Sequence, residues 1–202
     1  MRSVTVPVNR IKRAPKAQAI AEAALLRGLA ATGLLAQLAD GQGVLAMIPI
    51  YSFSARNIVA GKWNRGWRSG WRYFWTHPNC DFGVTVEVRR VSGSDPKLAS
   101  VSTGRAAVAL ARALCIETRN LAAGPARYRA RILRLPWISM EALWFNTDPL
   151  DVADKFISRD NILRNGAFLQ EAKQRATSFR ERIEAQKRTT KQSLHSPAHP
   201  LP

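Results

Sequence analysis

The sequence predicts an α+β fold: a long N-terminal helix packed on a mainly antiparallel, meandering sheet with a second helix, plus a charged C-terminal helical extension. Three observations predict it. Apolar residues recur at helical spacing from about residue 15 to residue 39. Strand-like segments then follow one another without intervening helices, which is typical of an antiparallel sheet. Beyond residue 147 the composition becomes highly charged and returns to helical spacing.

The first helix is expected to begin at Pro15, because a first helical turn tolerates proline. Asp40 and Gly41 supply the stop, so the predicted length is about 25 residues. Its weak point lies between Gly28 and Gly33, since glycine costs up to about 1 kcal/mol relative to alanine and permits a bend. The apolar residues at helical spacing are Ile20, Ala24, Leu25, Leu29, Leu34, Leu35 and Leu38.

Residues 44–53 are rich in β-branched and aromatic side chains and predict a strand. Pro49 within it argues for an edge strand or a bulge, because proline cannot donate to a strand ladder. The glycines from Gly61 to Gly70 indicate a turn before the next strand. Three further strands are expected at residues 71–76, 82–91 and 98–102.

A second helix is expected after residue 102, with Ser102 or Thr103 as its N-terminal cap. Its apolar face consists of Val108, Leu110, Ala111, Leu114, Cys115 and Leu121. Residues 128–145 are the longest strand candidate. Pro136 interrupts their alternation, which predicts a bulge or a bend into two strands.

The chain therefore divides into four predicted segments. They are a basic N-terminal arm at 1–14, a compact α+β domain at 15–147, a helical basic extension at 148–188 and a disordered tail at 189–202. Within the extension, an amphipathic piece around 150–157 precedes a charged helix at about 167–187.

The charge balance is strongly positive. Thirty-one Lys and Arg against fourteen Asp and Glu give a formal net charge of +17. Such a bias fits a polyanion partner, and it also fits mere solvation of an Arg-rich chain. It bears on association rather than on fold.

Four tryptophans recur at an interval of four residues, at Trp63, Trp67, Trp71 and Trp75. This spacing places all four on one face of a strand and nearly on one face of a helix, so it predicts a stripe. Trp71 and Trp75 lie in a strand pattern and are expected to be buried. Trp63 and Trp67 lie in a glycine-rich loop, where burial and exposure are both open.

Cations are interleaved with these indoles, which suggests a surface for nucleic acid or another polyanion. Bases stack on indoles, and Lys or Arg neutralises phosphates. The predicted contact residues are Lys62, Trp63, Arg65, Trp67, Arg68 and Arg72. An interfacial belt on an anionic membrane is a further possibility, because Trp and Arg also gather there.

We therefore expect a non-enzymatic basic binding module, with the C-terminal helix as a second arm. The alternative is a protein interaction or assembly subunit whose sheet edge or C-terminal helix docks on a partner. No catalytic residue is predicted, because the expected compact region has a single histidine, His77, and active sites need convergent titratable groups.

No cofactor or metal site is predicted. Gly41 and Gly43 partly match a dinucleotide pattern, but the expected helix precedes them and the strand follows, the reverse of what such a site needs. His77 and Cys80 lack the further ligands of a zinc site. The aspartates at 148, 151 and 154 lack the closing glutamate of a calcium loop.

Two cysteines, Cys80 and Cys115, are too few for a disulfide framework and suggest a reducing, cytoplasmic location. Glu22 and Arg27 interrupt the N-terminal apolar run, so no transmembrane segment is predicted. The basic, acid-free N-terminus leaves an organelle presequence as an alternative.

Overall fold

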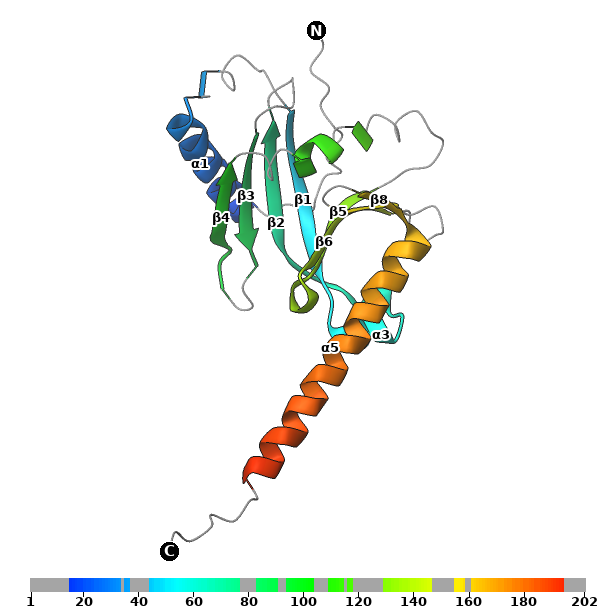
Figure 1. The fold of residues 1–202 in the computed structure, drawn as a ribbon. Coiled ribbons are helices and arrows are strands. Elements are labelled where there is room, and N and C mark those ends of the chain that lie inside the picture. The colour runs from blue at the N-terminus through cyan, green and yellow to red at the C-terminus, as the bar shows by residue number, and fades with distance from the viewer. Residues whose placement is uncertain are drawn as a thin grey trace, which may run out of the picture.

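The computed structural model describes residues 15–33, 35–36, 44–76, 83–90, 94–103, 109–114, 116–117, 129–146, 155–158 and 161–194. Its helices include α1 Pro15–Ala31, α3 Ala55–Val59 and α5 Asn165–Leu194, with 3-10 turns η1 Trp63–Arg65 and η2 Pro136–Ile138. The strands are β1 Val44–Ser52, β2 Trp67–Thr76, β3 Gly83–Arg89, β4 Lys97–Thr103, β5 Arg129–Leu135, β6 Met140–Asn146, β7 Lys155–Ser158 and β8 Asn161–Arg164. Figure 1 shows that helices and sheet form the predicted α+β fold.

Within the described residues, eight strands form one sheet in the order β4-β3-β2-β1-β5-β6-β7-β8. Strands β1 to β4 make one antiparallel meander, and β5 to β8 make a second. The two halves meet where β1 runs parallel to β5, over the three pairs from Ile50–Ile132 to Ser52–Arg134. We call this short parallel pairing the seam. The sheet is thus mainly antiparallel, as predicted.

Strand β1 lies at the centre of the sheet, so Pro49 does not mark an edge strand. Strand β5 pairs with β1 only from Ile50 onward, so no β5 residue is paired with the proline. The β1–β2 register shifts between Ile50 and Tyr51, where β2 carries one extra residue, Ser69. The bulge that proline predicts as the alternative therefore lies next to it.

Helix α1 covers the first half of the sheet and is shorter than predicted, with 17 residues rather than about 25. The chain turns at Gly33, whose φ of +72° is left-handed. Glycine adopts this conformation readily, so Gly33 ends the helix within its predicted weak stretch. A Cβ at Gly28 would meet Val84 and Val101 at 3.2 and 3.3 Å, so α1 lies close on β3 and β4. The buried residues of α1 are Ala17, Ala21, Ala24, Leu25 and Leu29.

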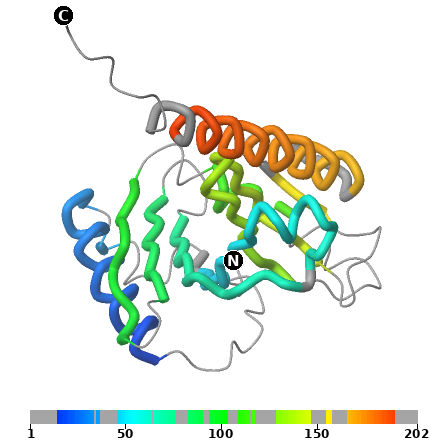
Figure 2. The backbone as a smooth tube through the Cα atoms, turned by 90° about the horizontal axis from the view of Figure 1, so that it is seen from below, coloured from blue at the N-terminus to red at the C-terminus, as the bar shows by residue number. Residues whose placement is uncertain are grey.

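Helices α3 and α5 cover the second half of the sheet on the same face as α1. Met47 and Tyr51 lie on one side of β1; Met47 packs under α1 and Tyr51 packs under α5. The core beneath α5 contains a stack of rings, with centroids 5.8 Å apart for Trp144–Phe156 and 4.4 Å apart for Phe156–Phe168. Because the sheet twists, Figure 2 shows α1 and α5 on opposite sides of the molecule.

The other face of the sheet carries a third apolar cluster. Helical residues 109–114 cover it and bury Ala111 and Leu114, as predicted for the second helix. The strand residues of this cluster are Ala46, Ile48, Ile50, Phe74, Ile132, Leu143, Phe145 and Ile157. The predicted helix residues Val108, Cys115 and Leu121 lie outside the described residues.

The sheet continues beyond residue 147, which corrects the predicted end of the compact domain. Strands β7 and β8 form a hairpin on β6, with Phe156 and Ile157 buried on opposite faces. Strands of four residues are too short for a readable period, so the sequence pattern does not separate them from the extension. The first half of α5 is also core, through Phe168, Ala172 and Ala176.

Helix α5 also continues into the segment predicted to be a disordered tail. It ends at Leu194, and the hydroxyl of Thr189 donates to the carbonyl of Ala185 at 3.2 Å. No proline lies between residue 188 and the end of the helix at Leu194, so the sequence there does not force an earlier end. Figure 1 shows the later turns of α5 projecting from the body. The predicted arm at 1–14 and the last residues, 195–202, lie outside the described residues.

Candidate functional site

The segment between β1 and β2 is a closely hydrogen-bonded loop. Ser54 Oγ caps α3 by accepting from the backbone N–H of Asn57 at 3.2 Å. The Asn57 carbonyl accepts from the Lys62 N–H at 2.8 Å, and its side-chain amide donates to the Arg65 carbonyl at 3.2 Å. Gly61, whose φ is +65°, makes the turn between α3 and Lys62. The loop therefore fixes the backbone from which Lys62 and Arg65 extend.

A buried aromatic ring supports this loop from inside. Phe53 is 1% exposed and lies so close to Gly66 that a Cβ there would overlap its ring. Trp63 packs on the same ring, with centroids 5.8 Å apart and planes inclined at 58°. Trp63 is half-buried, so its main role is to hold the loop against Phe53.

The four tryptophans do not form the predicted single stripe. The spacing would keep Trp67, Trp71 and Trp75 on one face of a regular strand, but the bulge at Ser69 inserts a residue between the first two. Trp71 and Trp75 are 3% and 1% exposed beneath α1, as predicted. Trp67 pairs with Ser52 on the other face of the sheet and is 52% exposed.

Cations flank this exposed indole in the sequence, and no carboxylates accompany them. The sequence contains no Asp or Glu from residue 41 to residue 80. Lys62 and Arg65 are exposed, and no carboxylate of the described residues forms an ion pair with either one or with Arg68. We call Lys62, Arg65, Trp67 and Arg68 the basic loop surface.

Arg68 follows Trp67 in β2 and lies on the opposite face of the sheet. Its guanidinium carbon is 5.0 Å from the centroid of the Trp71 ring, a cation–π stack. Its Nε is buried and, within the described part of the chain, has no hydrogen-bond partner. Arg68 thus adds a half-buried cation on the face of the sheet opposite to Trp67.

Arg72 does not belong to this surface, because two carboxylates already pair with it. It donates to Glu87 at 3.0 Å and to both carboxylate oxygens of Glu141. Arg134 bonds the same partners, Glu87 at 2.5 and 2.6 Å and Glu141 at 2.7 Å. We call these four residues the ion-pair network. It links β2 and β3 to β5 and β6 across the seam.

The ion-pair network is charged at neutral pH but has no net charge. Burial by itself would raise the pKa of the Glu87 carboxyl, which is 8% exposed. Hydrogen bonds and charge from Arg134 and Arg72 outweigh burial and lower that pKa from 4.5 to about 2. The same arginines lower the pKa of Glu141 against the effect of burial. The arrangement therefore stabilises the fold and supplies neither a general acid nor a general base near pH 7.

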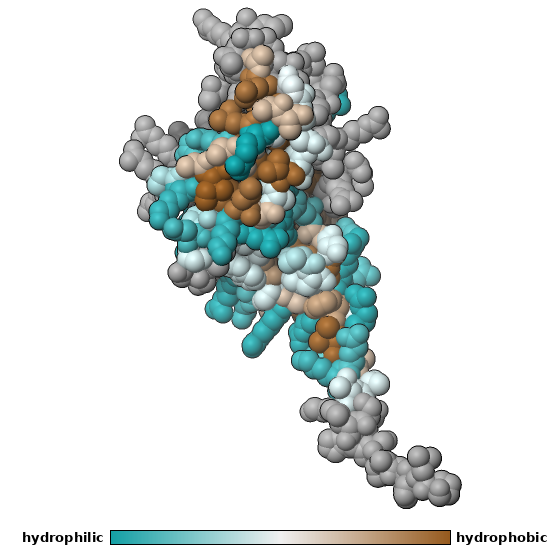
Figure 3. Space-filling view, turned by 90° about the vertical axis from the view of Figure 1, so that its left-hand side faces the viewer, coloured by the Kyte–Doolittle hydropathy of each residue, from teal (hydrophilic) through white to brown (hydrophobic). Residues whose placement is uncertain are grey.

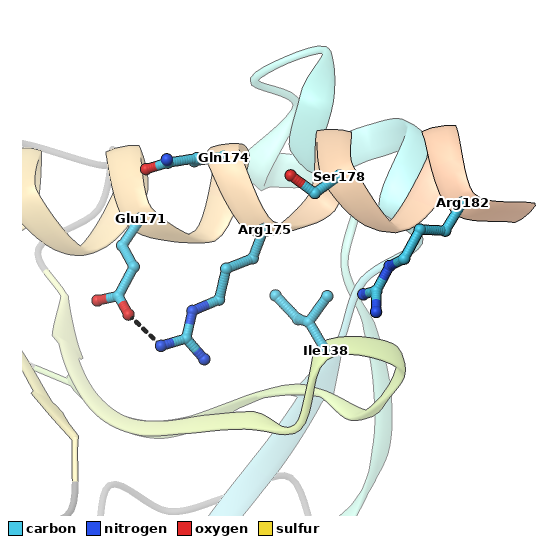
Figure 4. Close-up of a pocket in the computed structure, with 6 residues that line it drawn as sticks. All are labelled: Ile138, Glu171, Gln174, Arg175, Ser178 and Arg182. Atoms are coloured by element: carbon cyan, nitrogen blue, oxygen red, sulfur yellow. Dashed lines mark hydrogen bonds and ion pairs between the residues drawn. The ribbon is translucent and has the colours of Figure 1, made fainter.

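The predicted second arm, α5, adds exposed cations beside a shallow pocket of about 440 Å³. Figure 4 shows Arg175 and Arg182 extending from α5 on either side of Ile138 of η2, with Arg175 turned toward Glu171. Arg175 pairs with Glu171 at 2.5 Å, which leaves Arg182 as a cation without a partner among the residues drawn. The pocket therefore carries one surplus positive charge.

A different surface lies at the first edge of the sheet. β4 is an edge strand whose seven residues are all exposed. Leu98 and Val101 of β4 are each 41% exposed, and Leu26 of α1 is similarly open. Figure 3 shows apolar side chains gathered on this side of the molecule. The surface combines apolar area with a strand edge on which no other described strand pairs, which suits contact with protein.

Comparisons with known proteins find no match. No family model fits the chain, no curated sequence is similar to it, and no solved structure resembles it. Function is therefore inferred from the surfaces described above.

Other candidate sites receive no support from the described part of the chain. There, no three His, Cys, Asp or Glu side chains lie close enough together to bind a metal ion. In the same residues, no helix combines the length and apolar character that crossing a bilayer demands. The earlier candidates at residues 41–43, 77–80, 115 and 148–154 lie outside the described ranges.

Sequence reasoning did not locate the two features that reshape the tryptophan segment, although Pro49 predicted a bulge on the neighbouring strand. The first is the bulge at Ser69, because the bulged residue itself is neither proline nor glycine. Only the neighbouring Gly70 approaches the Val88 carbonyl too closely for any side chain. The second is the pairing of Arg72 with carboxylates 15 and 69 residues away. Local spacing carries no information on such distant partners.

Proposed function

We propose that this protein is a non-enzymatic binding module that contacts single-stranded nucleic acid through the basic loop surface. The observation that supports it is an indole more than half exposed, Trp67, two to five residues along the chain from two exposed cations, Lys62 and Arg65, that have no carboxylate partner among the described residues. Hydrogen bonds fix the backbone of the loop that carries Lys62 and Arg65, so little backbone freedom is lost when a ligand binds.

The chemistry fits a strand whose bases are accessible. A base stacked on Trp67 contributes about 1 to 3 kcal/mol, independently of its identity. Lys62 and Arg65 neutralise phosphates and release counterions, which makes the affinity depend on salt. The two cysteines of the chain support a reducing, cytoplasmic setting for such a module.

Fluorescence anisotropy of a labelled single-stranded oligonucleotide, titrated at several salt concentrations, tests the proposal. We expect the wild-type affinity to fall as salt rises. The double variant Lys62→Ala/Arg65→Ala should lower the slope of log affinity against log salt by about 1.4, because each phosphate contact on a single strand contributes about 0.7. Arg27→Ala/Lys97→Ala removes the same charge from exposed positions of α1 and β4 and serves as the control.

Trp67→Ala tests the stacking contact separately. Its side chain is exposed, so the melting temperature should change little while affinity falls by about fivefold or more. Wild-type protein that does not bind, or binds equally at all salt concentrations, refutes the proposal. Equal loss of affinity in the control double variant would show that net charge acts without this surface.

The apolar edge at β4 favours a second candidate function, an interaction or assembly subunit that docks on a protein partner. An exposed edge strand can receive an added strand, and Leu98 and Val101 supply apolar contacts beside it. A Val101→Lys variant should then prevent co-purification of a protein partner, while nuclease treatment leaves the complex intact. A complex that nuclease dissolves favours the first function.

A further inference from the structure

Two arginines and three aromatic rings alternate in one row across the sheet. The row runs over β2, β1, β5 and β6 on the face that also carries α1 and α5. Its members, in spatial order, are Trp71, Arg68, Tyr51, Arg131 and Trp144. We call this row the arginine-aromatic ladder.

The geometry of the ladder follows from strand register and stacking distances. Arg68 is directly opposite Tyr51 in the β1–β2 pair, and its guanidinium lies 5.0 Å from the Trp71 ring. Arg131 is opposite Trp144 in the β5–β6 pair. Its guanidinium lies between two rings, 5.1 Å from that of Tyr51 and 5.3 Å from that of Trp144.

Charge separates the two faces of the sheet at this level. On the other face, Arg72 and Arg134 each bond two carboxylates. On the ladder face, no carboxylate of the described residues pairs with Arg68 or Arg131. Both ladder arginines are half-buried rather than fully solvated, and Arg68 Nε is buried without a hydrogen bond within the described residues.

A stacked guanidinium has unfilled bonding capacity at its edges. One ring covers a flat face of Arg68 and two rings flank Arg131, while hydrogen bonds of a guanidinium form in its plane. That planar fork matches two oxygens of a phosphate group. Stacking also fixes the orientation in advance, so binding costs less side-chain entropy than it does for a free arginine.

Two such forks lie on strands separated by β1. Adjacent strands are about 4.8 Å apart, so the strands that carry the two arginines are roughly 10 Å apart. A chain of phosphates that crosses the strands can place one phosphate on each guanidinium.

We propose that Arg68 and Arg131 bind separate phosphate groups of one polyanionic strand that crosses β2, β1 and β5. This inference rests on the proposed function and deepens it. It makes Arg131 a binding residue and extends the contact from the basic loop surface onto the ladder face. Tyr51, half-buried between the two arginines, orients Arg131 through the stack.

The test compares Arg131→Lys and Arg131→Gln with wild type in the anisotropy titration. Lysine keeps the charge without the planar fork, and glutamine removes both. We expect glutamine to weaken oligonucleotide binding about tenfold and lysine to restore only part of it. Arg112→Gln, at an exposed site on the helical segment 109–114, is the matched control and should bind like wild type. Thermal melting of each variant identifies any loss of fold.

A direct readout does not depend on variants. In a ¹⁵N spectrum of the folded protein, the side-chain N–H signals of Arg68 and Arg131 should shift on adding inorganic polyphosphate or a single-stranded oligonucleotide. Orthophosphate at the same phosphate concentration should leave them in place. Equal shifts with orthophosphate would overturn the requirement for a chain of phosphates.

The outcomes separate this inference from the proposed function. Binding that Lys62→Ala/Arg65→Ala weakens and Arg131→Gln leaves intact, without shifts of the ladder signals, overturns the ladder site alone. Wild-type protein that binds neither oligonucleotide nor polyphosphate overturns both. Full rescue by Arg131→Lys would show that charge suffices and would reject the planar contact.

Discussion

Replacing Glu87 with glutamine removes one of the two carboxylates of the ion-pair network while keeping its size. Arg134 and Arg72 lower the pKa of Glu87 from 4.5 to about 2. One pKa unit corresponds to about 1.4 kcal/mol, so the carboxylate contributes about 3 kcal/mol to the free energy of unfolding at pH 7. Losing one member of a buried ionic group typically costs a similar amount, about 3 to 5 kcal/mol.

The pH dependence gives the sign of the effect. Because the folded-state pKa is the lower one, the contribution of Glu87 is complete above pH 4.5 and disappears as the pH falls toward 2. We therefore expect Glu87→Gln to destabilise the protein by about 3 kcal/mol at pH 7 and by only about 1 kcal/mol at pH 3. Urea unfolding followed by circular dichroism at both pH values measures the difference.

Glu184→Gln is the matched control. Glu184 also pairs with an arginine, Arg180 at 3.6 Å, but its side chain is 56% exposed on the projecting part of α5. Exposed pairs of this kind contribute about 0.5 kcal/mol or less, so this variant should be nearly neutral at both pH values. A loss below 1 kcal/mol for Glu87→Gln at pH 7, or an equal loss at pH 3, would refute the electrostatic reasoning.

Three further predictions follow from the packing. Gly66→Ala should lower the free energy of unfolding by about 1 to 3 kcal/mol in urea titration, because its Cβ would overlap a buried ring, whereas Gly166→Ala meets open space and should not destabilise. Spectrophotometric titration should show that Tyr73 ionises well above pH 10, since burial, and then the charge of Glu22, raise its pKa; ionisation near pH 10 would contradict this. Removing residues 185–202 should leave the melting temperature within about 2 °C, because residues 185–190 are exposed; a larger fall would show that this segment packs.

The parts of the fold that follow from local pattern were predictable. The strand at 82–91, the break at Pro136 and the burial of Trp71 and Trp75 each depend on neighbours within a few residues. Glycine preferences even indicated where α1 weakens, although they did not show that Gly33 ends it.

The parts that depend on distant pairing were not predictable. Gly70 is compatible with a bulge, but nothing in residues 67–72 identifies Ser69 as the extra residue, and this residue decides which face Trp67 occupies. Arg72 and Arg68 look equivalent in sequence, but only Arg72 lies opposite Glu87 of β3. The composition of the tryptophan segment therefore predicted a basic aromatic site. Strand register, which the sequence does not show, decided which of its residues are available for binding and which are structural.

The seam has a consequence for how the protein is made. Each half of the sheet consists of strands that are consecutive in sequence, so the half containing Arg72 and Glu87 leaves the ribosome before the half containing Arg134 and Glu141. Within each half, one arginine already neutralises one glutamate. When the halves join, neutral pairs rather than isolated charges lose water, so the late step of assembly avoids the steepest desolvation barrier.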